Sequence, residues 1–429
     1  MAGEWQSAPL SELCEQIADC PHSTPLWTDS GVIVLRNQNI RDGRLDLSSP
    51  SYTDEAHFEQ RSRRARLKAR DLVLTREAPM GEVCMVPEKL RCCLGQRMVM
   101  LRPDPKKCDS RFLLYSIQSD AVQHEIKVNE GTGSTVSNLR IPLLEALPIR
   151  HPLLAEQKAI AAVLGALDDK IELNRRMNAT LEAMARALFQ SWFVDFGPVR
   201  AKLDGRPAAA LDPTTASLFP EHLEDSPLGH IPKGWKAGTV VEGFNLTMGQ
   251  SPPGDTYNED GNGLSFYQGR TDFGFRFPTR RIFCSAPTRC AKPGDTLVSV
   301  RAPVGDINMA NEECCIGRGV AAVRHKSGAA SFTYHSMANL YPDFARFEAE
   351  GTVFGSINKD SFEKLRFVIP PTEIIAAYEH QAGPLDEQIR TLESQSRTLA
   401  TLRDTLLPKL LSGDISASNA GASSEVECD

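Results

Sequence analysis

Motifs that could support chemistry are few in this sequence, and each is incomplete. Methylation of an exocyclic amino group in DNA uses Asn or Asp, then Pro-Pro, then an aromatic residue, but the proline pairs here read Ser-Pro-Pro-Gly at 251–254 and Ile-Pro-Pro-Thr at 369–372. A phosphate-binding loop has four residues between its glycines and then a lysine. The segment 263–270 has five residues between its glycines and ends with Arg270. The sequence therefore predicts neither methyl transfer nor nucleotide binding.

Metal-dependent chemistry is equally poorly supported. Asp120, Glu125 and Lys127 are similar to the acids and lysine of a nuclease site, but short acid-x-Lys strings are common by chance. The eleven cysteines include adjacent pairs at 92–93 and 314–315 and no Cys-x-x-Cys, whereas structural zinc needs thiolates two to four residues apart. We expect these cysteines to be buried and reduced. No metal site and no catalytic residue is predicted, which argues against a self-contained methyltransferase or nuclease.

The charge of the chain is unevenly distributed. Its formal net charge is −7, whereas a simple nucleic-acid-binding protein would normally be basic. Residues 61–70, RSRRARLKAR, nevertheless carry six positive charges and no acid. Such a run is either a solvated face or an edge that follows a phosphate backbone. Since there is neither an apolar run of 18 residues nor a signal-peptide pattern, we expect a cytoplasmic protein.

The elements that must position any site are written twice. Residues 71–83, DLVLTREAPMGEV, align without a gap with residues 295–307, DTLVSVRAPVGDI, and share Ala-Pro-x-Gly. Each copy is an apolar strand with an arginine near its end, Arg76 or Arg301, which we place at matching positions. Further on, a Cys-Cys-apolar-Gly motif recurs after each copy. This ordered correspondence predicts two similar domains.

A long helix is predicted at the end of each half. Over 160–192 and again over 378–410, seam positions recur at alternating steps of four and three with a constant offset of 218. Such a seam is typical of a coiled coil and indicates that the two helices pair with each other. Polar residues interrupt both seams at one equivalent place, Asn178 and Ser396. A glycine followed by Pro384 predicts a break before a helix of about 28 residues.

These patterns predict an α+β fold with a pseudo-two-fold internal repeat, in which two strand-rich mixed α/β domains are joined by two long helices. Between the halves lies a stretch rich in Pro, Ala and Gly, which predicts an irregular linker or arm. The predicted boundaries are 1–151 for the first domain, 152–196 for the first helix region, 197–230 for the linker, 231–370 for the second domain, 371–415 for the second helix region and 416–429 for a disordered tail.

Several segments together resemble the specificity subunits of Type I restriction–modification enzymes. IPKGWK at 231–236 and LTMGQSPP at 246–253 are similar to the opening of a target-recognition domain, and LSFYQG at 264–269 and RAPVG at 301–305 continue the likeness. PLLAEQKAI at 152–160 looks like the start of the family's first shared helix, and LPKLLSG at 407–413 like the end of its second. The resemblance runs from Trp5 to about Ile415.

The resemblance implies a non-catalytic subunit that binds double-stranded DNA. Its two target-recognition domains would each read one half of a split site, and the two long helices would pair antiparallel and hold the domains apart. Two modification subunits would use S-adenosylmethionine to methylate an adenine in each half. Restriction subunits would use ATP and Mg to translocate and cleave DNA. No cofactor is expected in this chain itself.

Residues for DNA contact follow from that implication and from base chemistry, because Arg reads guanine and Asn or Gln reads adenine. The candidates for base edges are Arg36, Asn37, Gln38, Asn39 and Arg41 in the first domain, and Gln268, Arg270 and Arg276 in the second. Phosphate contacts are expected from Arg61, Arg63, Arg64, Arg66 and Lys68, and from Arg280 and Arg281. Arg76 and Arg301 belong to the candidate set as well, although either could be structural.

Two other functions remain open at this point. The chain could be an orphan DNA-binding module with the same fold and no restriction partner. It could also be a coiled-coil scaffold that binds only protein. A scaffold predicts no salt-dependent affinity for duplex DNA, and it leaves the duplicated strand-rich domains without a role.

Overall fold

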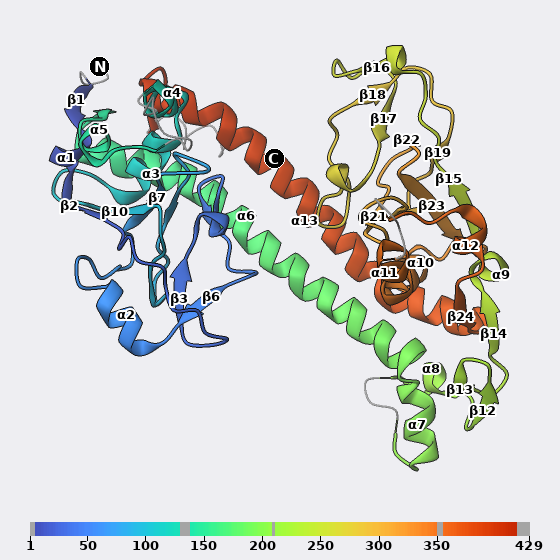
Figure 1. Cartoon of the computed structure of the whole chain (residues 1–429). Helices are drawn as coiled ribbons and strands as arrows, with labels where there is room; N and C mark the ends of the chain where they lie inside the picture. Colours follow the sequence, from blue (N-terminus) through green and yellow to red (C-terminus); the bar gives the residue numbers. More distant parts are fainter. Residues whose placement is uncertain (1–4, 129–137, 208–210, 350–354, 418–429) are drawn as a thin grey trace, which may run out of the picture. The chain divides into compact units, whose positions relative to one another are not determined.

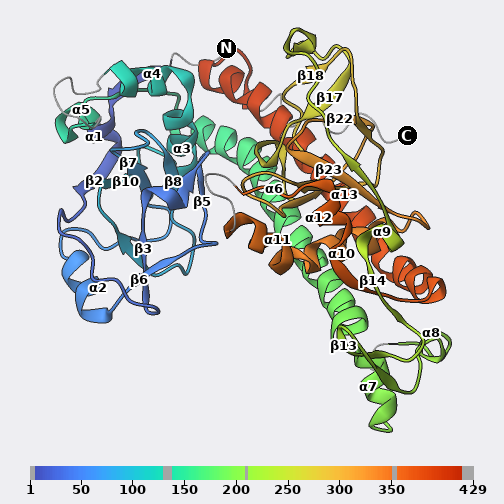
Figure 2. The same ribbon diagram turned by 45° about the vertical axis from the view of Figure 1, so that its right-hand side comes forward.

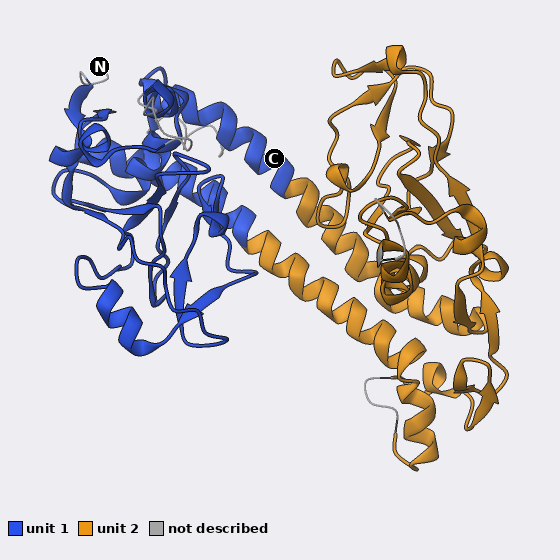
Figure 3. Cartoon of the chain, viewed as in Figure 1, with its two compact units in different colours: residues 1–172, 396–429 blue, residues 173–395 orange. Residues whose placement is uncertain are grey.

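The computed structural model describes residues 5–128, 138–207, 211–349 and 355–417. They form two compact units, the first made of residues 1–172 with 396–429 and the second of residues 173–395 (Figure 3). The boundary therefore falls inside two long helices, and each unit contains a segment of both. No helix in the described ranges is both long enough and apolar enough to cross a membrane.

The central sheet of unit 1 has four strands in the order β2-β10-β7-β8 (Figure 1). Beside it lies a three-stranded sheet in the order β6-β3-β9, and α2 lies next to this sheet (Figure 2). Phe58 of α2 packs in one cluster with Cys93 of β9. The strands are β1 (Gln6–Pro9), β2 (Cys14–Asp19), β3 (Val32–Leu35), β4 (Ile40–Arg41), β5 (Arg44–Leu45), β6 (Ser51–Thr53), β7 (Leu72–Thr75), β8 (Val83–Met85), β9 (Cys92–Leu94), β10 (Met98–Pro103) and β11 (Pro148–His151). The shorter helices are α1 (Leu10–Leu13), η1 (Asn37–Asn39), α2 (Glu55–Arg61), α3 (Ser110–Gln118), α4 (Asp120–Val128) and α5 (Ile141–Glu145).

Both faces of this central sheet are buried. Successive strand residues point to opposite sides, and the residues on each side of β7 belong to a core. Leu72 and Leu74 of β7 belong to the core under α3, whereas Val73 belongs to a second core formed with β3 and β9. Eight of the ten cysteines in the described ranges are buried, and none forms a disulfide. Burial raises the pKa of Cys92 to about 12 and that of Cys93 to about 11, so both stay uncharged thiols that pack as small apolar side chains.

Unit 2 is built on sheets with comparable connections. Its four-stranded sheet has the order β15-β23-β20-β21, and its five-stranded sheet the order β16-β18-β17-β22-β19. The strands are β12 (Leu223–Ser226), β13 (Gly229–Pro232), β14 (Lys236–Thr239), β15 (Phe244–Met248), β16 (Tyr257–Asn258), β17 (Leu264–Tyr267), β18 (Phe283–Cys284), β19 (Cys290–Ala291), β20 (Thr296–Ser299), β21 (Ile307–Met309), β22 (Cys314–Ile316), β23 (Val320–His325) and β24 (Arg366–Ile369). Its helices are η2 (Gln190–Val194), α7 (Gly197–Leu203), α8 (Pro213–Ser217), α9 (Val240–Gly243), η3 (Gly254–Thr256), η4 (Arg270–Asp272), α10 (Ala330–Asn339), α11 (Tyr341–Ala349) and α12 (Lys359–Glu363).

The Ala-Pro-x-Gly segments form the same kind of turn in each unit. Both Ala-Pro peptide bonds are cis, at Ala78-Pro79 and Ala302-Pro303. In unit 1 the Thr75 hydroxyl donates to the carbonyl of Pro79 at 2.6 Å, and in unit 2 the Ser299 hydroxyl donates to that of Pro303 at 2.7 Å. A hydroxyl at the end of the strand thus closes the turn that leads into the next strand.

The linker predicted at 197–230 is not irregular. It forms α7, α8 and the β12–β13 hairpin, and Val199 and Phe219 are buried in the main core of unit 2. The ring of Phe219 packs edge-on against Trp192, with 5.1 Å between ring centres. The prediction rested on the high Pro, Ala and Gly content and overlooked a few large apolar residues. Burial of these residues stabilises the segment.

The long helices are continuous where a break was predicted. α6 (Leu154–Phe189) runs through Gly165, and α13 (Thr372–Ser412) runs through Pro384. Proline removes one backbone donor. In unit 2, however, the helix has buried residues both before and after Pro384, among them Tyr378 and Ile389. Tertiary packing therefore outweighs the local signal.

Every position of the two predicted seams is buried or half-buried, with seven of the ten buried along 160–192 and five of the ten along 378–410. In unit 2 the Asn174 side chain donates to Gln395 Oε1 at 2.9 Å, and the Tyr378 hydroxyl donates to the Ala185 carbonyl at 3.3 Å. These helical segments therefore run in opposite directions. Beyond the end of α13, Ala417 is buried in the core of unit 1, although it was assigned to the disordered tail. The rest of the predicted tail, 418–429, lies outside the described residues.

The turn after β20 gives the first prediction. Gly305 has φ +95°, and a Cβ there would lie 2.5 Å from Phe344 Cβ. We expect Gly305→Ala to lower the free energy of unfolding by more than about 1 kcal/mol, measured as a lower midpoint in urea. Gly254→Ala is the matched control, because a Cβ at Gly254 meets nothing within 4 Å. Equal midpoints for the two variants would contradict this account of the turn.

Candidate nucleic-acid interface

A cavity of about 690 Å³ in unit 2 lies where several strands end. It is lined by the loop before β16, by the residues that follow β17 and β20, and by the turn between β22 and β23. Gly249 allows this arrangement, since a Cβ there would lie 2.2 Å from the Gly317 carbonyl. The lining residues are Ser251, Pro252, Gly254, Tyr257, Gln268, Gly269, Arg270, Thr271, Arg301, Ala302, Pro303, Arg318 and Gly319.

Three arginines give this cavity its chemistry. Arg270 Nε lies 2.9 Å from Asp306, which neutralises its charge. Arg301 and Arg318 are exposed, and within the described ranges no side-chain hydrogen bond or ion pair holds either guanidinium. Gln268 is exposed beside them. Guanidinium and amide groups are the donors that read guanine and adenine edges in the major groove.

The equivalent edge of unit 1 follows β3. Arg36 is exposed, and its guanidinium lies over the Trp27 ring, 5.2 Å from the ring centre. Arg41 is also exposed, as is Gln38, whereas Asn37 is half-buried and donates to the carbonyls of Glu77 and Ala78. Unit 1 thus presents two arginines and an exposed aromatic ring where unit 2 presents three arginines.

The basic stretch after α2 is only partly available for phosphate contacts. Arg63, Arg64 and Lys68 are exposed, and among the described residues none of the three has a side-chain ion pair. Arg66 pairs with Glu59. Neutralising Arg66 inside the fold weakens its value as a phosphate ligand.

Three residues of unit 1 that were predicted to contact DNA are buried instead. Arg61 is only 5% exposed, and its guanidinium donates to the carbonyls of Leu94 and Ser23. Asn39 accepts from the Arg36 backbone and donates to the carbonyl of Asp46. Both side chains form hydrogen bonds with backbone groups of the fold. The same polar atoms therefore cannot also contact DNA.

Arg76 is the third, and its burial exposes an error in the repeat alignment. Arg76 N donates to the Arg97 carbonyl, and Val300 N donates to the Gly319 carbonyl, so Arg76 matches Val300 rather than Arg301. A shift of one residue along a strand turns a side chain to the opposite face. Arg76 therefore points inward and binds Asp19 at 2.6 Å, whereas Arg301 is exposed.

Arg276 is fully buried and cannot read a base. Its Nη1 donates to Asp386 at 2.7 Å, its Nη2 pairs with Glu182, and its guanidinium lies 3.8 Å from the centre of the Tyr334 ring. Burial alone would lower the pKa of Arg276, but Tyr334 and the two carboxylates outweigh burial and raise it. The residue fixes the loop before β18 onto the long helices of its unit.

Arg280 and Arg281 are exposed, but each is paired with a carboxylate. Arg280 pairs with Glu312, and Arg281 Nη2 lies 2.7 Å from the buried Asp272. Asp272 also accepts from the Gln268 backbone at 2.8 Å. Arg281 therefore supports the loop that carries Gln268, and direct phosphate contact would have to compete with these carboxylates.

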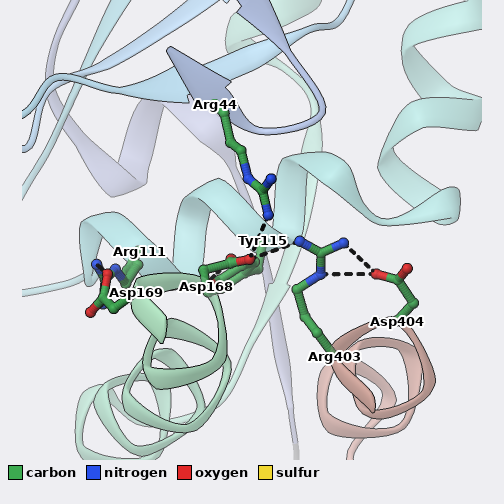
Figure 4. Close-up of polar contacts among 7 residues, drawn as sticks. All are labelled: Arg44, Arg111, Tyr115, Asp168, Asp169, Arg403 and Asp404. Carbon is green, nitrogen blue, oxygen red and sulfur yellow. Dashed lines mark hydrogen bonds and ion pairs between the residues drawn. The ribbon is translucent and has the colours of Figure 1, made fainter. Parts of the chain in front are cut away.

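Arg403 occupies a seam position of α13, where a charged residue is unexpected. A polar cluster in unit 1 accounts for it. Asp168 of α6 accepts from Arg403 Nη1 and from the Tyr115 hydroxyl, both at 2.7 Å, and from Arg44 at 3.5 Å (Figure 4). Burial, and next the charge of Asp168, raise the pKa of Tyr115, which stays a donor. Beside it, Arg111 binds Asp169. The charge on the seam is thus compensated within the unit.

Sequence reasoning missed Trp27, Arg318 and Tyr257. Trp27 is isolated in the sequence, and only its exposure and its contact with Arg36 mark it. Arg318 follows the repeated Cys-Cys-Ile-Gly motif directly. The repeated motif could have drawn attention to Arg318, because the motif forms the end of β22 and Arg318 follows it at the cavity.

The described ranges contain no cluster of metal-ligating side chains. No group of three or more His, Cys, Asp or Glu side chains there could hold a metal ion. Asp120 and Glu125 lie with Lys127 on the single helix α4.

Comparison with known proteins finds similarity along nearly the whole chain. Residues 3–183 match the family model of the Type I restriction modification DNA specificity domain. The chain is 26% identical to the putative type I restriction enzyme MjaX specificity subunit of Methanocaldococcus jannaschii, over 96% of this chain and 94% of that protein. It is 24% identical to the HindI specificity subunit of Haemophilus influenzae, over 75% and 81%. The crystal structure of a Type-I restriction-modification S subunit from M. genitalium shares the fold, with a TM-score of 0.59 at 16% identity and coverage of 95% and 96%.

Two arginines proposed for DNA contact should behave differently on truncation. Arg276→Ala leaves Asp386 and Glu182 without their cation, so we expect it to cost about 3–5 kcal/mol of stability. Arg280→Ala removes an exposed pair with Glu312 and should cost about 1 kcal/mol or less. Urea unfolding of both variants checks this. A small loss at Arg276 would mean that its carboxylates find other partners.

Proposed function

Because the chain belongs to the family of Type I restriction–modification specificity subunits, we propose that each of its two units reads one half of a divided DNA site. The chain recognises the sequence, and the catalytic steps belong to other subunits. The observation that carries direct readout is the cavity of unit 2, where Arg301 and Arg318 have no side-chain partner among the described residues and lie beside Gln268. Unit 1 contributes Arg36 and Trp27 at its equivalent edge.

The long helices are proposed to act as a spacer. α6 and α13 would pair as an antiparallel coiled coil, which the contacts between their segments inside unit 2 support. With 36 residues at 1.5 Å per residue, α6 spans about 54 Å. Half-sites one helical turn of DNA apart are about 34 Å from centre to centre, so a spacer of this length suits a split site. The similar hairpins of the two units support a pseudo-two-fold repeat.

The partners follow from the family rather than from this chain. Two modification subunits carrying S-adenosylmethionine would methylate an adenine in each half-site. Restriction subunits carrying ATP and Mg would move along the DNA and cut it. The net charge of −7 fits this division, because only the faces that meet DNA need to be basic.

Charge reversal in the basic stretch tests the DNA-binding face of unit 1. Arg63→Glu with Arg64→Glu should weaken binding to every duplex alike and lower the slope of log K against log salt by about 2, since each phosphate contact contributes about one unit. Arg66→Glu should change the slope less, because Arg66 is already paired with Glu59. An unchanged affinity and slope for the double variant would remove this stretch from the interface.

The decisive test of the function is a methylome. We expect a naive host that expresses this chain with its modification subunit to gain methyladenine in both halves of a split motif, read by single-molecule sequencing. A host with the modification subunit alone serves as the control. If a soluble complex of the two proteins produces no new methylation, the chain is an orphan module and the function proposed here is wrong.

A further inference from the structure

Equivalent edge positions of the two units carry opposite charge at one place, and an amide in place of a guanidinium group at another. The aligned hairpins place Glu77 of unit 1 where unit 2 has Arg301, since Arg76 matches Val300. In the same way, Gln96 of unit 1 matches Arg318, because Arg97 matches Gly319. Unit 1 therefore holds a carboxylate and an amide at the places where unit 2 holds two guanidinium groups.

The groups in unit 1 are already bound within the fold. Glu77 pairs with Arg97 at 3.0 Å, and Gln96 Nε2 donates to the His22 carbonyl at 3.0 Å. In unit 2 the described residues offer Arg301 and Arg318 no such side-chain partner. The neighbouring arginines differ in this respect, since Arg270, Arg280 and Arg281 each have a carboxylate. Within the described ranges, two of the exposed guanidinium groups at this edge therefore have donors that no other side chain binds.

The backbone that carries both arginines is held firmly in place. Val300 N donates to the Gly319 carbonyl at 2.9 Å, which ties the end of β20 to the turn that carries Arg318. Ala302 N donates to the Gly355 carbonyl at 3.0 Å on the other side of Arg301. Gly317 N donates to the Tyr267 carbonyl at 2.9 Å, next to Gln268. Side chains on rigid strand ends lose less freedom on binding than side chains on free loops.

From this geometry we infer that Arg301 and Arg318 read guanine in the half-site of unit 2, and that unit 1 makes no matching contact. The inference rests on the proposed function and adds the base class to it. A planar guanidinium can donate to O6 and N7 of one guanine at once, and this pairing is the commonest specific contact in the major groove. The cavity places Gln268, which suits adenine, on the same edge. The two halves of the DNA site therefore differ in composition.

Conservative variants separate base reading from phosphate binding. Arg301→Lys and Arg318→Lys keep the charge but lose the planar fork, so a phosphate contact would survive and a guanine contact would not. We expect full-length chains carrying these changes, tested against a randomised duplex library, to lose about 5- to 150-fold preference for guanine at positions in one half-site only. The other half-site and the salt dependence should remain those of the unaltered chain.

Arg346→Ala is the control, because Arg346 is exposed on α11 of the same unit and does not line the cavity. It should select the same motif as the unaltered chain, and thermal melting of all variants checks that they are folded. Unchanged preference in both lysine variants overturns the inference, as does a half-site made of A·T pairs alone in the unaltered chain. A uniform loss of affinity for Arg301→Ala with unaltered specificity in Arg301→Lys assigns the residue to phosphate. If the unaltered chain enriches no motif at all, the proposed function itself fails, and this result is distinct because both halves are then missing.

Discussion

The structure depends on neutralising one carboxylate on each long helix. Asp168 of α6 and Asp386 of α13 occupy equivalent positions, 218 residues apart, and both lie among packed side chains. A buried charge without a partner is costly, so each unit supplies an arginine: Arg44 with Arg403 in the first and Arg276 in the second. Arg44 and Arg276 come from the strand-rich parts, and these ion pairs hold each strand-rich part against the helices of its own unit.

The second determinant is the side of a strand to which a residue points. Position 76 in unit 1 and position 300 in unit 2 face the interior, and the next position points to the opposite side, where Glu77 is half-buried and Arg301 is exposed. The two units keep the backbone of this hairpin and its closing hydroxyl, while the outward position carries glutamate in one and arginine in the other. A rigid frame thus carries variable side chains, which is the arrangement that recognition requires.

Much of the fold could be predicted from the sequence, because duplicated patterns and periodicity report directly on burial. The apolar strands predicted before the two Ala-Pro-x-Gly segments are present as β7 and β20, and every seam residue of the helices is buried or half-buried. The helix break at Pro384 was wrong, since tertiary packing outweighed one lost hydrogen bond. The irregular linker was wrong because Phe219 and Val199 anchor it in the core. Individual site residues were hardest to predict. Arg276 lies in the loop before β18 and Arg301 lies just after β20, and only their surroundings separate a structural ion pair from an arginine without a side-chain partner among the described residues.

Under the proposed reading of DNA, the exchange of Glu77 for Arg301 gives the molecule a polarity. Two identical readers would bind a palindrome equally well in either orientation, whereas two different readers admit a duplex in one direction only. Every protein that docks on such a complex then meets a defined upstream and downstream side of the DNA. A chain built from two similar halves can in this way distinguish left from right along a helix whose own backbone is symmetric.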